Sequence, residues 1–187
     1  MAVIGHNGGP TLAAGHSWRR QCWTAARAQL LPVLPVEVVR LRVNRARQLG
    51  LDYKTYAGVR AATGHDLVAF LFSSNALQVD ANGVVLSADR AAKLENLADC
   101  GRIGLAVAPL DADALMRAAP ALDRADPAPW ALASFRDTGI ALRRALGALP
   151  GDRVLLIGDH MLERDWCAAG RLAGYLPSER FFAMGRP

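Results

Sequence analysis

The chain lacks any apolar run near the roughly 18 residues that a membrane-spanning helix needs. Its beginning lacks a basic segment followed by an apolar core, so we expect no secretory signal. Cysteine is also scarce, and Cys22, Cys100 and Cys167 are too widely spaced for a zinc site or a disulfide framework. These absences predict reduced thiols in a cytoplasmic protein that does not bind membranes.

Lysine is nearly absent, because only Lys54 and Lys93 are lysines among the 22 basic residues. The basic charge is uneven. Residues 1–66 hold nine Lys and Arg against three Asp and Glu, a net of +6, whereas residues 67–187 hold 13 against 14, a net of −1. A basic segment on a near-neutral body is typical of an element that binds DNA, another polyanion or an acidic protein partner. Arginine can also serve only as the solubilising residue, and that alternative stays open.

The apolar pattern predicts an α/β fold. Residues 67–72, 103–108 and 153–157 are short continuous apolar runs, typical of strands buried on both faces. Helical patterns alternate with them, which favours an open, mainly parallel sheet with helices on both faces, preceded by a small helical unit. We expect the three runs to be neighbouring central strands. Other expected elements are a hairpin beyond the first strand (77–86), helices (87–99, 111–118, 130–146, 160–172) and a loop (120–129).

The sequence divides into three predicted parts. Residues 1–16 are rich in glycine and predict a flexible tail, residues 17–66 a basic helical unit, and residues 67–187 the α/β domain. The opening GHNGGP is similar to the openings of some small alphaproteobacterial and phage proteins. Within the helical unit, capping and breaking residues predict helices over 18–31, 36–49 and 53–62.

The last two of these helices resemble the helix–turn–helix family over about 20 residues. Ala46 and Gly50 have the spacing of the small residue and the turn glycine, although Arg45 and Gly58 depart from the pattern. The resemblance implies that the second helix reaches base edges while arginines hold phosphates. An ordinary helical hairpin packed on the sheet is the alternative. The candidate nucleic-acid-binding residues are Arg40, Arg47, Tyr53, Lys54, Thr55 and Arg60.

The order of elements over residues 67–175 resembles the haloacid dehalogenase-like phosphatase fold. The stretch around LLIGD, residues 155–159, is similar to the last motif of that family, where acids hold magnesium; here these would be Asp159 and Asp165. The family's aspartate nucleophile and second aspartate are replaced by Ser73 and Asn75. Phosphoryl transfer of this kind needs a carboxylate nucleophile and a metal site, so the resemblance implies that the chemistry has been lost.

Polar residues also follow the predicted strands at the edge where open α/β sheets bind ligands. Ser73, Asn75 and Asp159 are therefore the candidate ligand-binding residues, for a small anion or for residual hydrolysis. His160 and Glu163 share a face near Asp159, which suits either a metal or acids that complement a helix dipole. We expect no catalytic residue, no metal site and no cofactor. The leading hypothesis is a non-enzymatic regulatory or nucleic-acid-associated protein.

Overall fold

The computed structural model describes residues 34–80 and 86–184. The chain forms two compact units, residues 1–39 and residues 40–187, and of the first only residues 34–39 are described. The predicted tail over 1–16 and the predicted helix over 18–31 lie outside the described residues. In the described ranges, no helix is long and apolar enough to cross a membrane.

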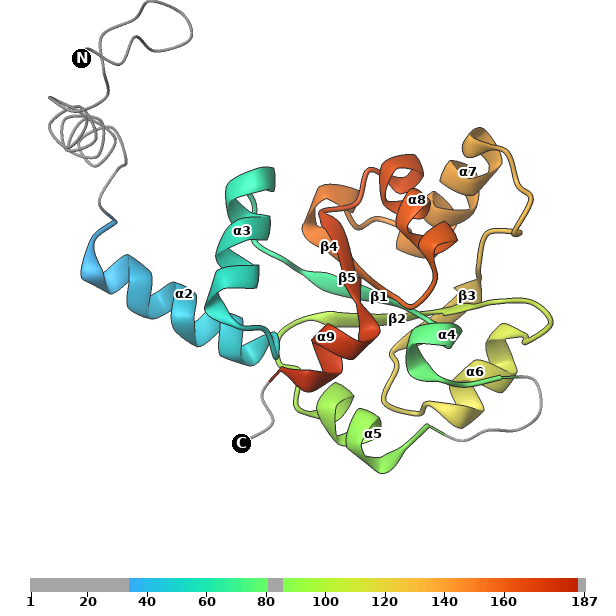
Figure 1. Cartoon of the computed structure of the whole chain (residues 1–187), viewed down its shortest axis with the longest axis horizontal. Coiled ribbons are helices and arrows are strands. Elements are labelled where there is room, and N and C mark those ends of the chain that lie inside the picture. Colours follow the sequence, from blue (N-terminus) through green and yellow to red (C-terminus); the bar gives the residue numbers. More distant parts are fainter. Residues whose placement is uncertain (1–33, 81–85, 185–187) are drawn as a thin grey trace, which may run out of the picture. The chain divides into compact units, whose positions relative to one another are not determined.

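A pair of helices joined by a tight turn forms the described part of the small helical unit (Figure 1). Gly50 and Gly64 adopt φ angles of 61° and 75°, a left-handed conformation that costs glycine least, and they follow the ends of the two helices. The Asp52 carboxylate accepts a hydrogen bond from the Thr55 N–H at 2.7 Å, which satisfies a free donor in the first turn. The helices are α2 (Val36–Gln48) and α3 (Tyr53–Thr63).

Gly58, in the middle of α3, is exposed, and nothing lies within 4 Å of the position that a Cβ would occupy. Glycine is less favourable than alanine inside a helix by about 1 kcal/mol. We therefore expect Gly58→Ala to raise the free energy of unfolding in urea by about 0.5–1 kcal/mol. Gly50→Ala is the control and should lower it, because its φ is positive and its Cβ would lie 3.0 Å from the Leu97 side chain. A loss of stability in Gly58→Ala would contradict this account of α3.

The body is built on one parallel sheet of five strands in the order β3-β2-β1-β4-β5 (Figure 1). The central strand β1 pairs in parallel with β2 on one side and with β4 on the other. The predicted α/β fold and the three predicted central strands are therefore confirmed. The strands are β1 (Ala69–Ser73), β2 (Gly101–Ala106), β3 (Arg124–Pro127), β4 (Val154–Gly158) and β5 (Gly174–Pro177).

Both edge strands differ from the expectations. The strand β3 lies inside the predicted loop over 120–129, and β5 follows the last predicted helix. Each has only four residues, and β3 has no buried residue, so neither produces a long apolar run. The predicted hairpin over 77–86 is wrong in its described residues, because Leu77 ends a helix and the flanking residues add no strand to the sheet. Residues 81–85 lie outside the described residues.

Helices cover both faces of the sheet and define two apolar clusters. Phe70, Phe72 and Ile157 pack in one cluster with residues of the helical pair, including Leu49 and Tyr56. Leu71, Leu105 and Leu156 pack in the other, against α7 and α8. Alternate residues of the central strands thus point to opposite faces, as continuous apolar runs require. The remaining helices are α4 (Ser74–Leu77), α5 (Ala88–Glu95), α6 (Ala112–Ala118), α7 (Phe135–Leu146), α8 (Met161–Gly170) and α9 (Ser178–Ala183).

The two described cysteines are partly buried free thiols. Burial raises the pKa of Cys100 to about 11 and that of Cys167 to about 12. A thiol is reactive as its thiolate, so both are weak nucleophiles at neutral pH. Neither cysteine therefore indicates a catalytic or metal-binding role, whereas Cys22 lies outside the described residues.

Candidate functional site

The sheet has a topological switch point between β1 and β4. From β1 it continues outward through β2 and β3, and it then crosses to the opposite side of β1 to form β4 and β5. Open α/β sheets bind ligands in the crevice beyond the carboxyl ends of the strands on either side of such a switch point. In this protein, Ser73 is the last residue of β1, Asn75 follows that strand, and Asp159 follows β4.

Ser73 is fully buried, and its hydroxyl group is used within the chain. Its Oγ accepts a hydrogen bond from the Ala76 N–H at 3.0 Å and caps α4. The next hydroxyl, Ser74 Oγ, accepts from the Val107 N–H at 3.2 Å and joins β1 to the end of β2. Both serines therefore fix the backbone at the edge of the crevice, and only Asn75 remains partly accessible there.

Glu163 is the polar centre of the crevice. Its side chain is only 2% exposed. One carboxylate oxygen accepts from Asn75 Nδ2 at 2.8 Å. The other accepts from the backbone N–H groups of Asp159, at 2.6 Å, and His160, at 3.2 Å. Glu163 thus ties the end of β1 to the end of β4 and occupies the third position of α8, where a carboxylate complements the free N–H groups.

The second acid at this edge is Glu163 and not Asp165, so that part of the expectation is corrected. Asp165 is exposed and lines a cavity of about 350 Å³ that Glu163 does not line. Successive helical residues are about 100° apart, so a shift of two positions turns a side chain to a different face. The third predicted ligand residue, Asp159, is exposed, and one of its carboxylate oxygens accepts from Ser178 Oγ at 2.7 Å.

A cavity of about 520 Å³ opens beside this polar centre. Its walls come from the segments that follow β1, β2, β3 and β4, so it lies at the carboxyl end of the sheet. Most lining side chains are apolar, while Asn75, His160 and Glu163 provide its polar groups. Few polar groups in a largely apolar concavity are typical of small-molecule sites. Among the described residues, no group of three or more His, Cys, Asp or Glu is placed to hold a metal ion.

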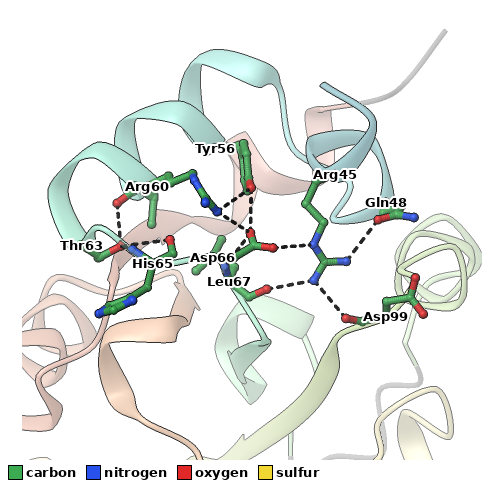
Figure 2. Close-up of polar contacts among 10 residues, drawn as sticks. Arg45, Gln48, Tyr56, Arg60, Thr63, His65, Asp66, Leu67 and Asp99 are labelled. Atoms are coloured by element: carbon green, nitrogen blue, oxygen red, sulfur yellow. Dashed lines mark hydrogen bonds and ion pairs between the residues drawn. The ribbon is translucent and has the colours of Figure 1, made fainter. Parts of the chain in front are cut away.

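The basic helical pair carries a different polar cluster, centred on Arg45 and Asp66 (Figure 2). Arg45 Nε donates to Asp66 at 3.2 Å, and its Nη2 donates to the carbonyl groups of Leu67, at 2.9 Å, and Asp99, at 3.0 Å. Tyr56 donates its hydroxyl to Asp66 at 2.7 Å. Burial, followed by the interactions with Asp66, raises the pKa of Tyr56. The arginine that departs from the helix–turn–helix pattern is thus a structural clamp.

The predicted nucleic-acid-binding residues fall into two groups in the structure, those that are accessible and those that bond to other residues of the chain. Arg40, Arg47 and Lys54 are exposed, and Tyr53 is half-buried. Thr55 and Arg60 are engaged within the chain. Thr55 Oγ1 donates to Asp52 at 2.8 Å and accepts from Arg180 at 2.7 Å. Arg60 lies 3.7 Å from an Asp66 oxygen. The packing of Leu49 and Tyr56 in the sheet's cluster favours the alternative of a packed helical hairpin.

Residue-level reasoning named Glu163 only as one acid among several at a helix start, and it expected the tryptophans to be core residues of helices. The signal for Glu163 was available, because an acid at the third position of a helix commonly bonds back to the first backbone N–H groups. Trp130 and Trp166 line the 520 Å³ cavity. Their part in it could not be read from sequence, because Trp130 lies in a segment that was expected to be helical.

Comparison with known proteins gives no match for this chain. No protein-family model fits it, and no curated protein and no solved structure is significantly similar to it. The haloacid dehalogenase-like and helix–turn–helix resemblances therefore rest only on the residues and element order described above.

Proposed function

We propose that this protein is a non-enzymatic, ligand-responsive protein that binds a small molecule in the cavity at the carboxyl end of its sheet. The observation that carries the proposal is the coincidence of the 520 Å³ cavity with the switch point between β1 and β4. Asn75 and Glu163 offer fixed polar groups there, and apolar side chains supply the remaining wall. A cytoplasmic location belongs to the proposal and is supported by the wide spacing of the cysteines.

Binding of the neutral apolar dye N-phenyl-1-naphthylamine to the full chain tests this proposal. Its fluorescence should rise to saturation with one site per chain as it leaves water. Ala131 is exposed and lines the cavity, so Ala131→Trp should fill the space and weaken binding at least tenfold. Ala148→Trp adds the same group at an exposed position outside the cavity lining and should change nothing. An absence of binding, or equal binding by both variants, would refute the proposal.

The absence of catalysis is a prediction that the geometry of Ser73 supports. This serine stands where the resemblance would require the aspartate nucleophile, and it is fully buried and committed to capping α4. A serine hydroxyl acts as a nucleophile only when a base activates it and a substrate can reach it, and burial denies Ser73 that access. We expect no magnesium-dependent hydrolysis of 4-nitrophenyl phosphate above the uncatalysed rate. Measurable hydrolysis that disappears in Asp159→Ala would contradict this and would favour an enzyme.

Binding of a polyanion by the helical pair is a second candidate function. Its support is that Arg40, Arg47 and Lys54 are exposed on α2 and α3, on either side of the turn at Gly50. Each lysine or arginine that neutralises a phosphate releases counterions, so affinity should fall steeply with salt. The pairing of Arg60 with Asp66 reduces the cations available for this contact.

For this candidate we expect weak binding of duplex DNA by the full chain, with log affinity falling against log salt with a slope near −3. Fluorescence anisotropy at several salt concentrations measures it. The double change Arg47→Ala and Lys54→Ala should reduce the slope by about 2 units. Arg117→Ala with Arg136→Ala removes the same charge from exposed positions on α6 and α7 and is the control. A flat slope, or equal effects of both pairs, would exclude the candidate.

A further inference from the structure

The carboxylate of Glu163 lies beside the cavity without a cationic partner. It is 2% exposed, and the three groups that donate to it, Asn75 Nδ2 and the backbone N–H groups of Asp159 and His160, are all neutral. No Lys or Arg of the described residues forms an ion pair with it. Neutral donors reduce the cost of a buried charge but leave its sign in place. This wall of the cavity is therefore negative.

The negative charge of Glu163 also affects the neighbouring side chain of Tyr175. Burial raises the pKa of Tyr175, and the negative charges of Glu163 and Asp159 raise it further, while Arg164 acts in the opposite direction. The Asp159 carboxylate has a neutral hydroxyl, that of Ser178, as its hydrogen-bond donor. Arg90 interacts with Asp159 and weakens the contribution of that carboxylate, so the negative field at this end of β4 comes mainly from Glu163. An anion bound beside Glu163 would be repelled. This argues against the predicted small anion as the occupant of this cavity.

The indole rings of two tryptophans also line the cavity. Trp166 is buried and Trp130 is 65% exposed, and both line the 520 Å³ cavity and the adjoining 350 Å³ cavity. Leu162, 60% exposed, lines both cavities as well. The face of an indole attracts a cation more strongly than the other aromatic side chains do, and the attraction grows where water is excluded. The exposed apolar side chains at the same place favour a ligand with an apolar body.

We propose that the ligand of this cavity is an organic cation, an amine or quaternary ammonium group carried on an apolar skeleton. The cationic group neutralises the field of Glu163 and contacts the indoles, and the skeleton covers the apolar wall between Trp130 and Leu162. A hydrated metal ion would leave that apolar wall exposed. This inference rests on the proposed function, because it assigns a ligand class to the same cavity.

A charge series of three soluble compounds of nearly equal size tests the ligand class. Benzylammonium, benzyl alcohol and benzoate should displace N-phenyl-1-naphthylamine from the full chain in that order of potency. The experiment is run at pH 8, above the ordinary pKa of an imidazole. We expect benzylammonium to act at a concentration at least tenfold below that of benzyl alcohol, and benzoate to be the weakest.

Variants test whether Glu163 causes the preference for the cationic compound. Glu163→Gln should bring the three compounds to within about threefold of one another, whereas Glu95→Gln, the same change at an exposed position of α5, should leave the order intact. If Glu163→Gln fails to fold, Trp130→Leu replaces it. That variant should weaken benzylammonium at least threefold more than benzyl alcohol, and Trp130→Phe should retain most of the difference.

The outcomes separate the inference from the function on which it rests. If the dye binds in an Ala131→Trp-sensitive way but the series shows no preference for the cation, the inference is wrong and the binding function stands. If the dye does not bind at all, both the proposed binding function and the inferred ligand class are wrong. If the preference exists but survives unchanged in Glu163→Gln, the cation is held elsewhere and the inference is wrong.

Discussion

Arg45→Met is expected to lower the free energy of unfolding by about 2–4 kcal/mol, measured by urea denaturation. The change keeps most of the side-chain length but removes the donors to Asp66 and to the carbonyl groups of Leu67 and Asp99 (Figure 2). Leaving partly buried acceptors without donors costs about 1–3 kcal/mol. The Arg45 and Asp66 side chains are 18% and 40% exposed, so solvent screening keeps the loss below that of a fully buried pair.

Arg47→Met is the matched control, because Arg47 is an exposed residue of the same helix. It should change stability by no more than about 0.5 kcal/mol. Arg45→Lys should give an intermediate loss, since an ammonium group cannot reproduce the planar fork of guanidinium donors. Equal losses for Arg45→Met and Arg47→Met would show that the clamp contributes nothing specific, and that basic charge in general stabilises α2.

The central strands could be predicted from the sequence, whereas the contacts of Arg45 could not. Continuous apolar runs identified the central strands correctly, because a strand buried on both faces has little tolerance for polar residues. The same reasoning missed β3 and β5, because each of these edge strands has only four residues and is too short to give a continuous apolar run. It treated Arg45 as a defect in a DNA-binding pattern. Its real partners come from positions 21 and 54 residues further along the chain, and no local pattern contains that information.

Sequence reasoning named some of the residues that line the candidate site and missed others. The rule that ligands bind beyond the carboxyl ends of parallel strands directed attention to Asn75 and Asp159. The structure places both beside Glu163, and their binding of a ligand stays a prediction. That rule could not show that Ser73 faces α4 as a cap, since the same sequence permits either orientation of a serine. Nor could it choose Glu163 over Asp165, because that choice depends on the residue at which α8 begins.

Asn75→Asp is expected to have the other large effect, a loss of about 2–4 kcal/mol in the free energy of unfolding at pH 8. The substitution replaces a donor to Glu163, 2.8 Å away, with a second carboxyl group beside one that is almost fully buried. Two carboxylates that share a site cannot both be ionised without strong repulsion, so one of them holds a proton in the folded state. The unfolded chain has no such constraint, and the cost therefore depends on pH.

The sign of that dependence follows from the proton balance. Above about pH 5 the folded variant binds one proton more than its unfolded chain, so its stability falls as pH rises, relative to the wild type, and recovers toward pH 4. Thermal melts of both proteins between pH 4 and pH 8 measure the difference. Magnesium ions should raise the melting temperature of the variant more than that of the wild type, because paired carboxylates suit this hard cation.

Asn96→Asp makes the same charge change at an exposed position and should show neither effect. A variant whose stability relative to the wild type is unchanged between pH 4 and pH 8 would mean that the side chain at position 75 turns away from Glu163, and the crevice would then lack the polar contact that joins β1 to β4.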